Sequence, residues 1–236
     1  MVEVTLVDAS VPLGSERFEA LLSWVSPAKR ARIARFRLAR DAQNCLLADV
    51  LARREIARRT GLDARGLTFW ANPWGKPALV PAGTPSVPGC AVQFNVSHTG
   101  TWVVCATSQA PVGIDIELVA PIDAGVVRRF FAPDEAAYVF AGDVQHRFAE
   151  IWTKKEARIK WSGQGLSIPL PSFSVLASDP GGLVYHRVRP DAAEFCCHVC
   201  TDRPDAPSIQ TLTGSALAET ALEDAVLGQQ RGQHGA

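Results

Sequence analysis

Residues 112–118 alternate strictly between apolar and other side chains, and this pattern constrains the chain more than any other. Valine, isoleucine and leucine occupy the even positions, whereas Gly113, Asp115 and Glu117 occupy the odd ones. Successive side chains of a strand point to opposite sides, so this period predicts a β-strand with one buried face. Asp115 and Glu117 therefore project from the same side, close enough to share one hard cation between their oxygens.

A second stretch has the spacing of a helix. Phe148 and Trp152 lie on an apolar stripe, and Gly163 follows at a position where a helix would stop. Glu156 and Lys160 are one turn apart and share a face. A strand with two carboxylates, beside a helix with a third carboxylate and a lysine, can hold Mg²⁺ against a diphosphate.

Each motif alone also has a structural interpretation. An isolated D-x-E on an amphipathic strand is usually its solvated face, and a helix rich in Lys and Glu is usually surface. The third segment, residues 94–100 (FNVSHTG), precedes both of these motifs. The joint occurrence of all three favours a functional site.

Together these segments resemble the surfactin-synthetase-activating (Sfp) type of 4′-phosphopantetheinyl transferase. That family carries N-[IV]-S-H-[ST], then G-[IV]-D-[IV]-E, then W-x-x-K-E-[AS]-x-x-K, in this order. Here the three motifs occupy residues 95–99, 113–117 and 152–160. The resemblance covers about residues 1–212 and includes the Gly75-Lys76-Pro77 loop. Where relatives often carry Arg and Gly in R-x-L-L-G, this chain has Asn44 and Ala48.

The resemblance implies an α/β (α+β) fold of two similar α/β subdomains related by a pseudo-twofold, with the active site between them. We expect the subdomains at residues 1–108 and 109–215, and a short helix and flexible tail at 216–236. A faint repeat, VCAT at residues 104–107 and VCT at residues 199–201, fits this architecture.

The implied activity is transfer of the 4′-phosphopantetheine of coenzyme A to a serine of an apo carrier protein (acyl, peptidyl or aryl), with release of 3′,5′-ADP. Mg²⁺ or Mn²⁺ would be held by Asp115, Glu117 and Glu156. Phosphoryl chemistry of this kind depends mainly on positioning and charge neutralisation. Three candidates for the base that takes the serine proton stay open: Glu156, Glu135 and a metal-bound water.

The resemblance also assigns coenzyme A contacts. Lys29 and Arg32 align with basic residues that grip the 3′-phosphate, and Lys76 matches the lysine of the loop beside it. Lys160 and His98 would contact the diphosphate. The full set of predicted coenzyme A residues is Lys29, Arg32, Lys76, Ser97, His98 and Lys160.

Length and composition agree with a compact cytoplasmic enzyme, and we expect a monomer. A chain of 236 residues with 47% hydrophobic content can bury a substantial core. Its net charge of zero implies no global attraction to nucleic acid or membrane, and it has no apolar run long enough to span a bilayer. The six cysteines lack framework spacing and suit a reducing compartment. We interpret residues 196–200 (CCHVC) as a buried strand, because this is not a usual zinc spacing.

Two other function classes fit parts of the sequence. A Mg²⁺-dependent phosphoesterase acting on CoA-like or nucleotide substrates could use the same carboxylates without a carrier protein. A non-catalytic carrier- or nucleic-acid-binding module could use the basic segment Lys29–Arg59, which has ten Lys or Arg and three acidic residues. We interpret the end of that segment, Arg53–Arg59, as a solvated helix face.

The remaining pattern predicts local elements. A strand opens the chain at residues 2–6, and helices run from Ser26 to Arg59 with a break near residues 38–41. Five prolines and three glycines predict a long loop over residues 71–90. Two strands then flank a turn at residues 98–101. Residues 120–131 could dock a carrier protein, or could instead pack Val127 into the core of a short helix.

Overall fold

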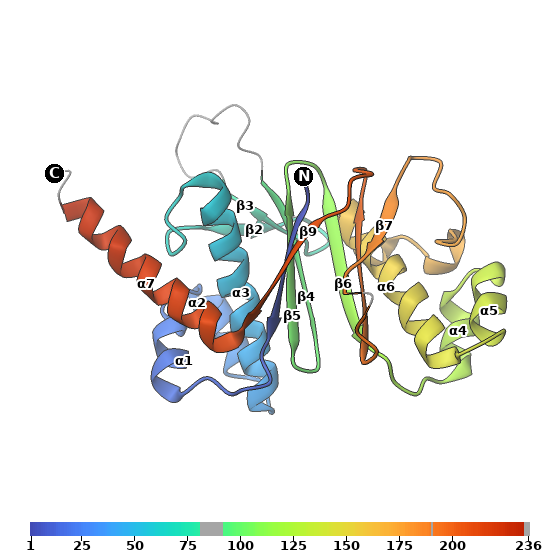
Figure 1. Cartoon of the computed structure of the whole chain (residues 1–236), viewed down its shortest axis with the longest axis horizontal. Helices are drawn as coiled ribbons and strands as arrows, with labels where there is room; N and C mark the ends of the chain where they lie inside the picture. Colours follow the sequence, from blue (N-terminus) through green and yellow to red (C-terminus); the bar gives the residue numbers. More distant parts are fainter. Residues whose placement is uncertain (81–91, 190, 234–236) are drawn as a thin grey trace.

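Two halves of the chain repeat one order of elements in the computed structural model, which describes residues 1–80, 92–189 and 191–233. Each half contains a strand, three α-helices and two more strands in this order, and the first half also has a short hairpin after its third helix (Figure 1). The first half contains β1 (Glu3–Asp8), α1 (Ser15–Leu22), α2 (Pro27–Ile33), α3 (Ala39–Thr60), β4 (Gln93–Thr99) and β5 (Trp102–Ser108). The second contains β6 (Val112–Leu118), α4 (Ala124–Phe130), α5 (Pro133–Phe140), α6 (Val144–Ser162), β7 (Val184–Arg187) and β8 (Phe195–Thr201).

The sheets repeat in the same way. The first half has the strand order β4-β5-β1 and the second has β7-β8-β6, with antiparallel pairs throughout. The long helices α3 and α6 end at Gly61 and Gly163, which adopt left-handed φ values of 73° and 71°. Glycine reaches this conformation without a Cβ penalty, and so it ends the helix. The prediction of two similar α/β subdomains is confirmed.

The two sheets meet where β4 lies beside β6. Side chains rather than a backbone ladder join these strands: Asn95 Oδ1 accepts from the Ile114 amide at 2.9 Å, and Ser97 Oγ donates to Asp115 Oδ1 at 2.8 Å. Both strands run in the same direction, because increasing residue numbers on β4 meet increasing numbers on β6. The turn starts two residues later than predicted, because β4 continues through Thr99 and only Gly100 and Thr101 form the turn.

The end of the chain returns to the first half. Strand β9 (Ser208–Thr213) pairs in parallel with β1, and α7 (Gly214–Gln233) follows. Leu217, Ala218 and Ala221 of α7 are buried in the same core as α3. The expected second subdomain of residues 109–215 therefore ends in a strand of the first sheet, and the expected short helix has 20 residues.

The predicted loop after α3 contains regular structure. Strands β2 (Phe69–Ala71) and β3 (Pro77–Leu79) form an antiparallel hairpin, in which Pro77 is tolerated because it is the first residue of its strand. Residues 81–90 of the predicted loop lie outside the described part. Helix α1 was not predicted from the sequence. None of the described helices has the length and apolar character that crossing a membrane requires.

Helix α6 lies directly on the face of β6 that carries Asp115. A Cβ at Gly113 would overlap the Ala157 carbonyl and the Trp161 amide of that helix. The alternative interpretation of this face as merely solvated is therefore excluded, because Asp115 is only 3% exposed. The opposite face packs into the core between the two sheets. Strand β8 is buried along its whole length, which confirms the structural interpretation of the cysteine-rich segment.

We expect Gly113→Ala to lower the free energy of unfolding by about 1–3 kcal/mol, as overpacking does, because the new methyl group meets helix backbone that cannot rotate away. Urea unfolding measures this change. Gly14→Ala is the matched control, since its added Cβ would meet nothing within 4 Å. Equal stability of the two variants would contradict the close packing of α6 on β6.

Candidate active site

Charged side chains from β6 and α6 converge at the seam between the two sheets. Lys160 Nζ of α6 lies 2.6 Å from Asp115 Oδ1 and donates to Ser97 Oγ at 3.1 Å. Thr99 Oγ1 donates to Glu117 Oε2 at 3.2 Å. Ser97 and Thr99 of β4 thus contact Asp115 and Glu117 of β6, and α6 covers this face of the strand.

Glu156 completes the group of carboxylates. Burial and the neighbouring Asp115 charge raise the pKa of Glu156 to about 7. The same two causes raise the pKa of Glu117, although the Thr99 hydrogen bond and Lys160 oppose the shift. Like charges disfavour each other's ionised form, so Asp115 lies near enough to both glutamates to affect their ionisation. Sequence spacing predicted this convergence.

The donor set fits a divalent cation. Asp115 Oδ2 is buried and has no hydrogen-bond partner among the described residues, so one oxygen is left for a ligand. Carboxylate oxygens are the ligands that Mg²⁺ prefers, and the surplus negative charge favours a cation. As the side chains stand, no three His, Cys, Asp or Glu groups in the described part are arranged closely enough to hold a metal. Lys160 provides the positive charge next to Asp115 instead.

His98 of β4 is near both the site of the carboxylates and a basic region on α2. Alternation along β4 places Phe94, Val96 and His98 on one face, and the first two line a pocket. Partial burial and the positive charges of Lys160, Lys29 and Arg32 lower the pKa of His98. The imidazole therefore lies between the cations of α6 and those of α2, where a bound anion would meet both.

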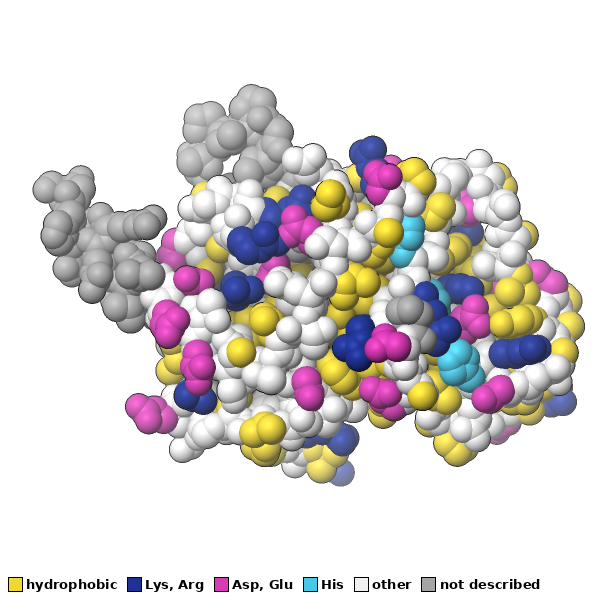
Figure 2. Space-filling model, in the orientation of Figure 1, with side chains coloured by type: hydrophobic (Ala, Val, Ile, Leu, Met, Phe, Trp, Pro, Cys, Tyr) yellow, Lys and Arg dark blue, Asp and Glu magenta, His cyan; other side chains and the backbone are white. Residues whose placement is uncertain are grey.

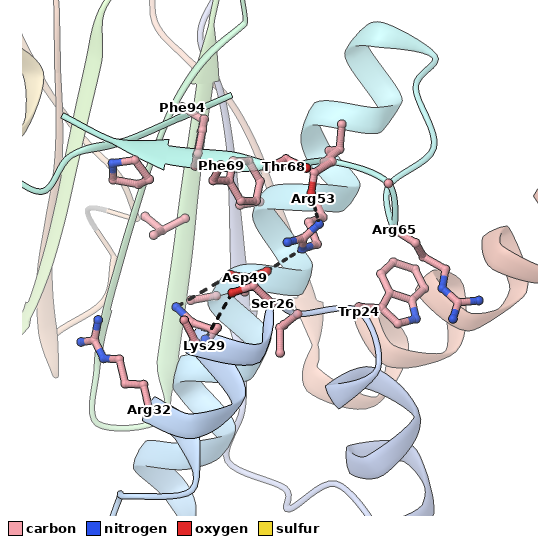
Figure 3. A pocket seen from close by; sticks show the side chains of 18 of the residues that line it. Trp24, Ser26, Lys29, Arg32, Asp49, Arg53, Arg65, Thr68, Phe69 and Phe94 are labelled. Atoms are coloured by element: carbon pink, nitrogen blue, oxygen red, sulfur yellow. Dashed lines mark hydrogen bonds and ion pairs between the residues drawn. The ribbon is translucent and has the colours of Figure 1, made fainter. Parts of the chain in front are cut away.

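The pocket beside α2 has a volume of about 620 Å³, a size typical of small-ligand sites. Lys29 and Arg32 project from α2 into it, as Figure 3 shows. Ser26 caps that helix by accepting from the Lys29 amide, and Pro27 follows at the first helical position, which fixes where the helix begins. Phe69 and Phe94 line the pocket, and their rings pack with 5.2 Å between centroids and an interplanar angle of 48°.

Two charged residues that line this pocket, Asp49 and Arg53, were not predicted as site residues from the sequence. Arg53 donates to Asp49 Oδ1 at 2.6 Å and to the Leu67 carbonyl at 2.6 Å, and it is only 4% exposed. Asp49 also lies 3.9 Å from Lys29 Nζ and so holds that lysine at the pocket. The interpretation of Arg53 as part of a solvated face is wrong, because α3 places it over the Phe69 ring. The i, i+4 spacing of Asp49 and Arg53 was the available signal.

Comparisons with known proteins agree with this arrangement. Residues 12–110 match the family described as 4′-phosphopantetheinyl transferase, N-terminal, and residues 111–219 match the 4′-phosphopantetheinyl transferase superfamily. The chain is 36% identical to the 4′-phosphopantetheinyl transferase Sfp of Bacillus subtilis (strain 168), over 85% of this chain and 92% of that protein. It is 38% identical to the transferase psf-1 of Bacillus pumilus over 70% of both chains. The gsp transferase of Aneurinibacillus migulanus is 31% identical, over 78% of this chain and 76% of that protein.

The chain belongs to the 4′-phosphopantetheinyl transferase superfamily. It is therefore an enzyme, and the interpretation as a non-catalytic binding module is wrong. Arginines of the basic segment form ion pairs within this transferase. Glu55 pairs with Arg54 at 2.8 Å and with Arg58 at 3.2 Å. On the face shown in Figure 2, basic and acidic side chains are interspersed.

In this transferase Lys76 does not line the pocket that Lys29 and Arg32 enter. Its Nζ donates to the carbonyls of Val112 and Trp161, at 3.2 and 3.1 Å, where β6 begins and α6 ends. Burial lowers the pKa of Lys76 to about 8. Contact of this lysine with a phosphate stays a prediction, and it requires the side chain to leave these carbonyls.

Glu135 has a structural role, and its catalytic assignment needs correction. Its side chain is fully buried, pairs with Lys155 at 2.7 Å, and accepts from the amides of Ala132 and Val175. These contacts join α5 to α6 and leave no oxygen free for a serine proton. Val127 is also fully buried, which supports the core interpretation of α4 over docking.

Asn44 departs from the family pattern and also has a structural contact. It is 2% exposed, and its Nδ2 donates to the Gly100 carbonyl at 2.8 Å. Helix α3 thereby holds the turn that follows His98 and Thr99. The Asn44 side chain therefore binds this turn, whereas relatives often carry an arginine at this position.

We expect the Glu156 carboxyl to titrate near pH 7, so that the enzyme releases about one more proton than Glu156→Gln between pH 6 and 8. Carboxyl ¹³C shifts measure it directly. Asp115→Asn should move this pKa down toward 4.5, because one cause of its elevation is removed. Glu150 on the same helix is the control. Burial alone would raise the pKa of Glu150, but the hydrogen bond and charge of Lys154 outweigh it and lower that pKa. Titration of Glu156 near 4.5 in the unaltered enzyme would contradict the convergence of the carboxylates.

Proposed function

We propose that this enzyme transfers the 4′-phosphopantetheine group of coenzyme A to a serine of an apo carrier protein, in a Mg²⁺-dependent reaction that releases 3′,5′-ADP. The supporting observation is the convergence of Asp115, Glu117, Glu156 and Lys160 at the seam, next to a basic pocket. In the reaction the serine Oγ forms a bond to the β-phosphorus, the bridging phosphorus–oxygen bond breaks, and 3′,5′-ADP leaves with the bond electrons.

The chain's residues fall into three roles. Lys29 and Arg32 would bind the 3′-phosphate in the pocket beside α2, where two cations from one helix face fix its position. His98 and Lys160 would contact the diphosphate and offset the negative charge that develops on the leaving group. Ser97 orients Lys160 through its hydrogen bond.

The carboxylates Asp115, Glu117 and Glu156 would hold Mg²⁺ or Mn²⁺, and the free Oδ2 of Asp115 is the oxygen best placed for this. When bound, the cation supplies charge neutralisation for the diphosphate. Lys160, whose Nζ lies 2.6 Å from Asp115, would contact the phosphate oxygens beside this site. Of the two side-chain candidates for the base that takes the serine proton, Glu156 lies in this group of carboxylates, whereas Glu135 is held by Lys155.

Membership of the transferase superfamily disfavours the phosphoesterase alternative. A single assay separates the two activities. The enzyme is incubated with coenzyme A and Mg²⁺, with and without an apo carrier protein, and both 3′,5′-ADP and carrier mass are measured. Transfer predicts release of 3′,5′-ADP only with the carrier, together with a carrier that gains phosphopantetheine. Release without a carrier would instead support the phosphoesterase.

We expect Asp115→Asn to abolish transfer and to weaken Mg²⁺ binding measured by calorimetry, because one carboxylate of the set is lost. Asparagine keeps the size of this buried side chain, so circular dichroism should stay native. Asp202→Asn, at an exposed ion pair with Arg203, is the matched control and should behave like the unaltered enzyme. Near-normal turnover of Asp115→Asn at ordinary Mg²⁺ concentration would refute the metal assignment.

We expect Lys29→Ala and Arg32→Ala to weaken binding of coenzyme A by about 1.5–3 kcal/mol each, since each removes a charged hydrogen bond. Binding of dephospho-coenzyme A, which lacks the 3′-phosphate, should change little. Arg30→Ala is the control, because Arg30 lies on the same helix but lines a different pocket. Equal losses for both ligands would show that α2 does not bind the 3′-phosphate.

A further inference from the structure

The loop of the β2–β3 hairpin contacts the C-terminal end of α6. The hairpin belongs to the first half of the chain, whereas α6 belongs to the second. Asn72 Nδ2 donates to the Gly163 carbonyl at 2.7 Å. At Gly163 a Cβ would lie 3.2 Å from Asn72 Nδ2 and 3.1 Å from Lys76 Cδ, so the two segments are in direct contact.

Asn72 also builds the loop that makes this contact. Its Oδ1 accepts from the amides of Trp74 and Lys76, at 3.0 and 2.9 Å. Its backbone amide donates to the Lys76 carbonyl at 3.0 Å, and its carbonyl accepts from the Gly75 amide at 2.9 Å. An asparagine side chain that closes its own turn in this way leaves its amide protons free for one distant partner. That partner is the residue that ends α6.

The last carbonyls of a helix lack partners within the helix, and donors from elsewhere stabilise them. Here the hairpin supplies two: Lys76 Nζ on the Trp161 carbonyl and Asn72 Nδ2 on the Gly163 carbonyl. Lys160 lies immediately before Trp161, and its Nζ reaches Asp115 at 2.6 Å. The hairpin therefore fixes the helical turn from which Lys160 projects.

We propose that Asn72 is a positioning residue, which holds the end of α6 from the opposite half of the molecule and thereby keeps Lys160 and Glu156 in register with Asp115 and Glu117. This inference rests on the proposed function, because it assigns Asn72 a task in the same transfer reaction. Asn72 itself acts only through α6 and the hairpin. Since Lys76 is also predicted to bind phosphate, Asn72 is the contact that stays on α6 when that lysine moves.

The test uses Asn72→Asp in the full-length enzyme. Aspartate keeps the acceptor for the Trp74 and Lys76 amides and removes the donor to Gly163, so the turn remains and the contact with α6 is lost. We expect amide hydrogen exchange in residues 159–163 to become about ten-fold faster, as local opening does. We expect kcat to fall by about ten-fold and KM for coenzyme A to stay unchanged, because misplaced groups slow the chemical step.

Two variants serve as controls. Ala71→Asp places the same charge on an exposed residue of β2 and should leave both exchange and kcat as in the unaltered enzyme. Asn72→Gln retains an amide donor and should recover most of the exchange protection and of kcat. Circular dichroism confirms that all variants are folded.

The outcomes are distinct. Faster exchange at residues 159–163 together with a lower kcat in Asn72→Asp, and recovery in Asn72→Gln, supports the proposal. Unchanged exchange overturns it, as does faster exchange with an unchanged kcat. If the unaltered enzyme transfers nothing, the proposed function itself fails, whereas the exchange comparison still decides whether Asn72 holds the end of α6.

Discussion

The Asp115 carboxylate joins the two halves of the molecule. It accepts from Ser97 on β4 of the first half and pairs with Lys160 on α6 of the second, while its own strand, β6, forms the edge between them. Because it is only 3% exposed, these contacts form in a region of reduced solvation, where charged hydrogen bonds are strong and an unpaired oxygen is costly. The site thus depends on one buried charge that has more acceptor capacity than its protein partners use.

The repeated halves contribute different chemistry to this seam. The first half provides cations, on α2 and in the pocket formed with α3, whereas the second provides carboxylates on β6 and α6. The two long helices occupy equivalent places and both end at a left-handed glycine. They differ in what they carry: α3 packs Arg53 against Asp49, and α6 presents Glu156 and Lys160. Two halves with the same fold therefore form an asymmetric site, which can receive an anion beside α2 and a cation beside β6 and α6.

Most of the site could be predicted from the sequence, because its residues follow simple periods. Alternation placed Asp115 and Glu117 on one face, and helical spacing placed Glu156 beside Lys160. The predictions that failed concerned contacts between segments that are distant in the sequence. Alternation alone could not show that α6 covers the polar face of β6, nor that Lys76 reaches Val112 and Trp161. Glu135 was misassigned because a buried ion pair with Lys155 leaves no periodic signal.

The crossing of β9 and α7 back to the first half has a consequence for synthesis of the chain. Elements β6 to β8 of the second half are contiguous in the sequence, whereas β9 and α7 of the first half follow them in the chain. The first half cannot complete its sheet or its core until β9 has paired with β1 and α7 has covered α3. The first half therefore cannot finish folding before the second half has been synthesised, and the core that the two sheets share ties both halves into one folding unit.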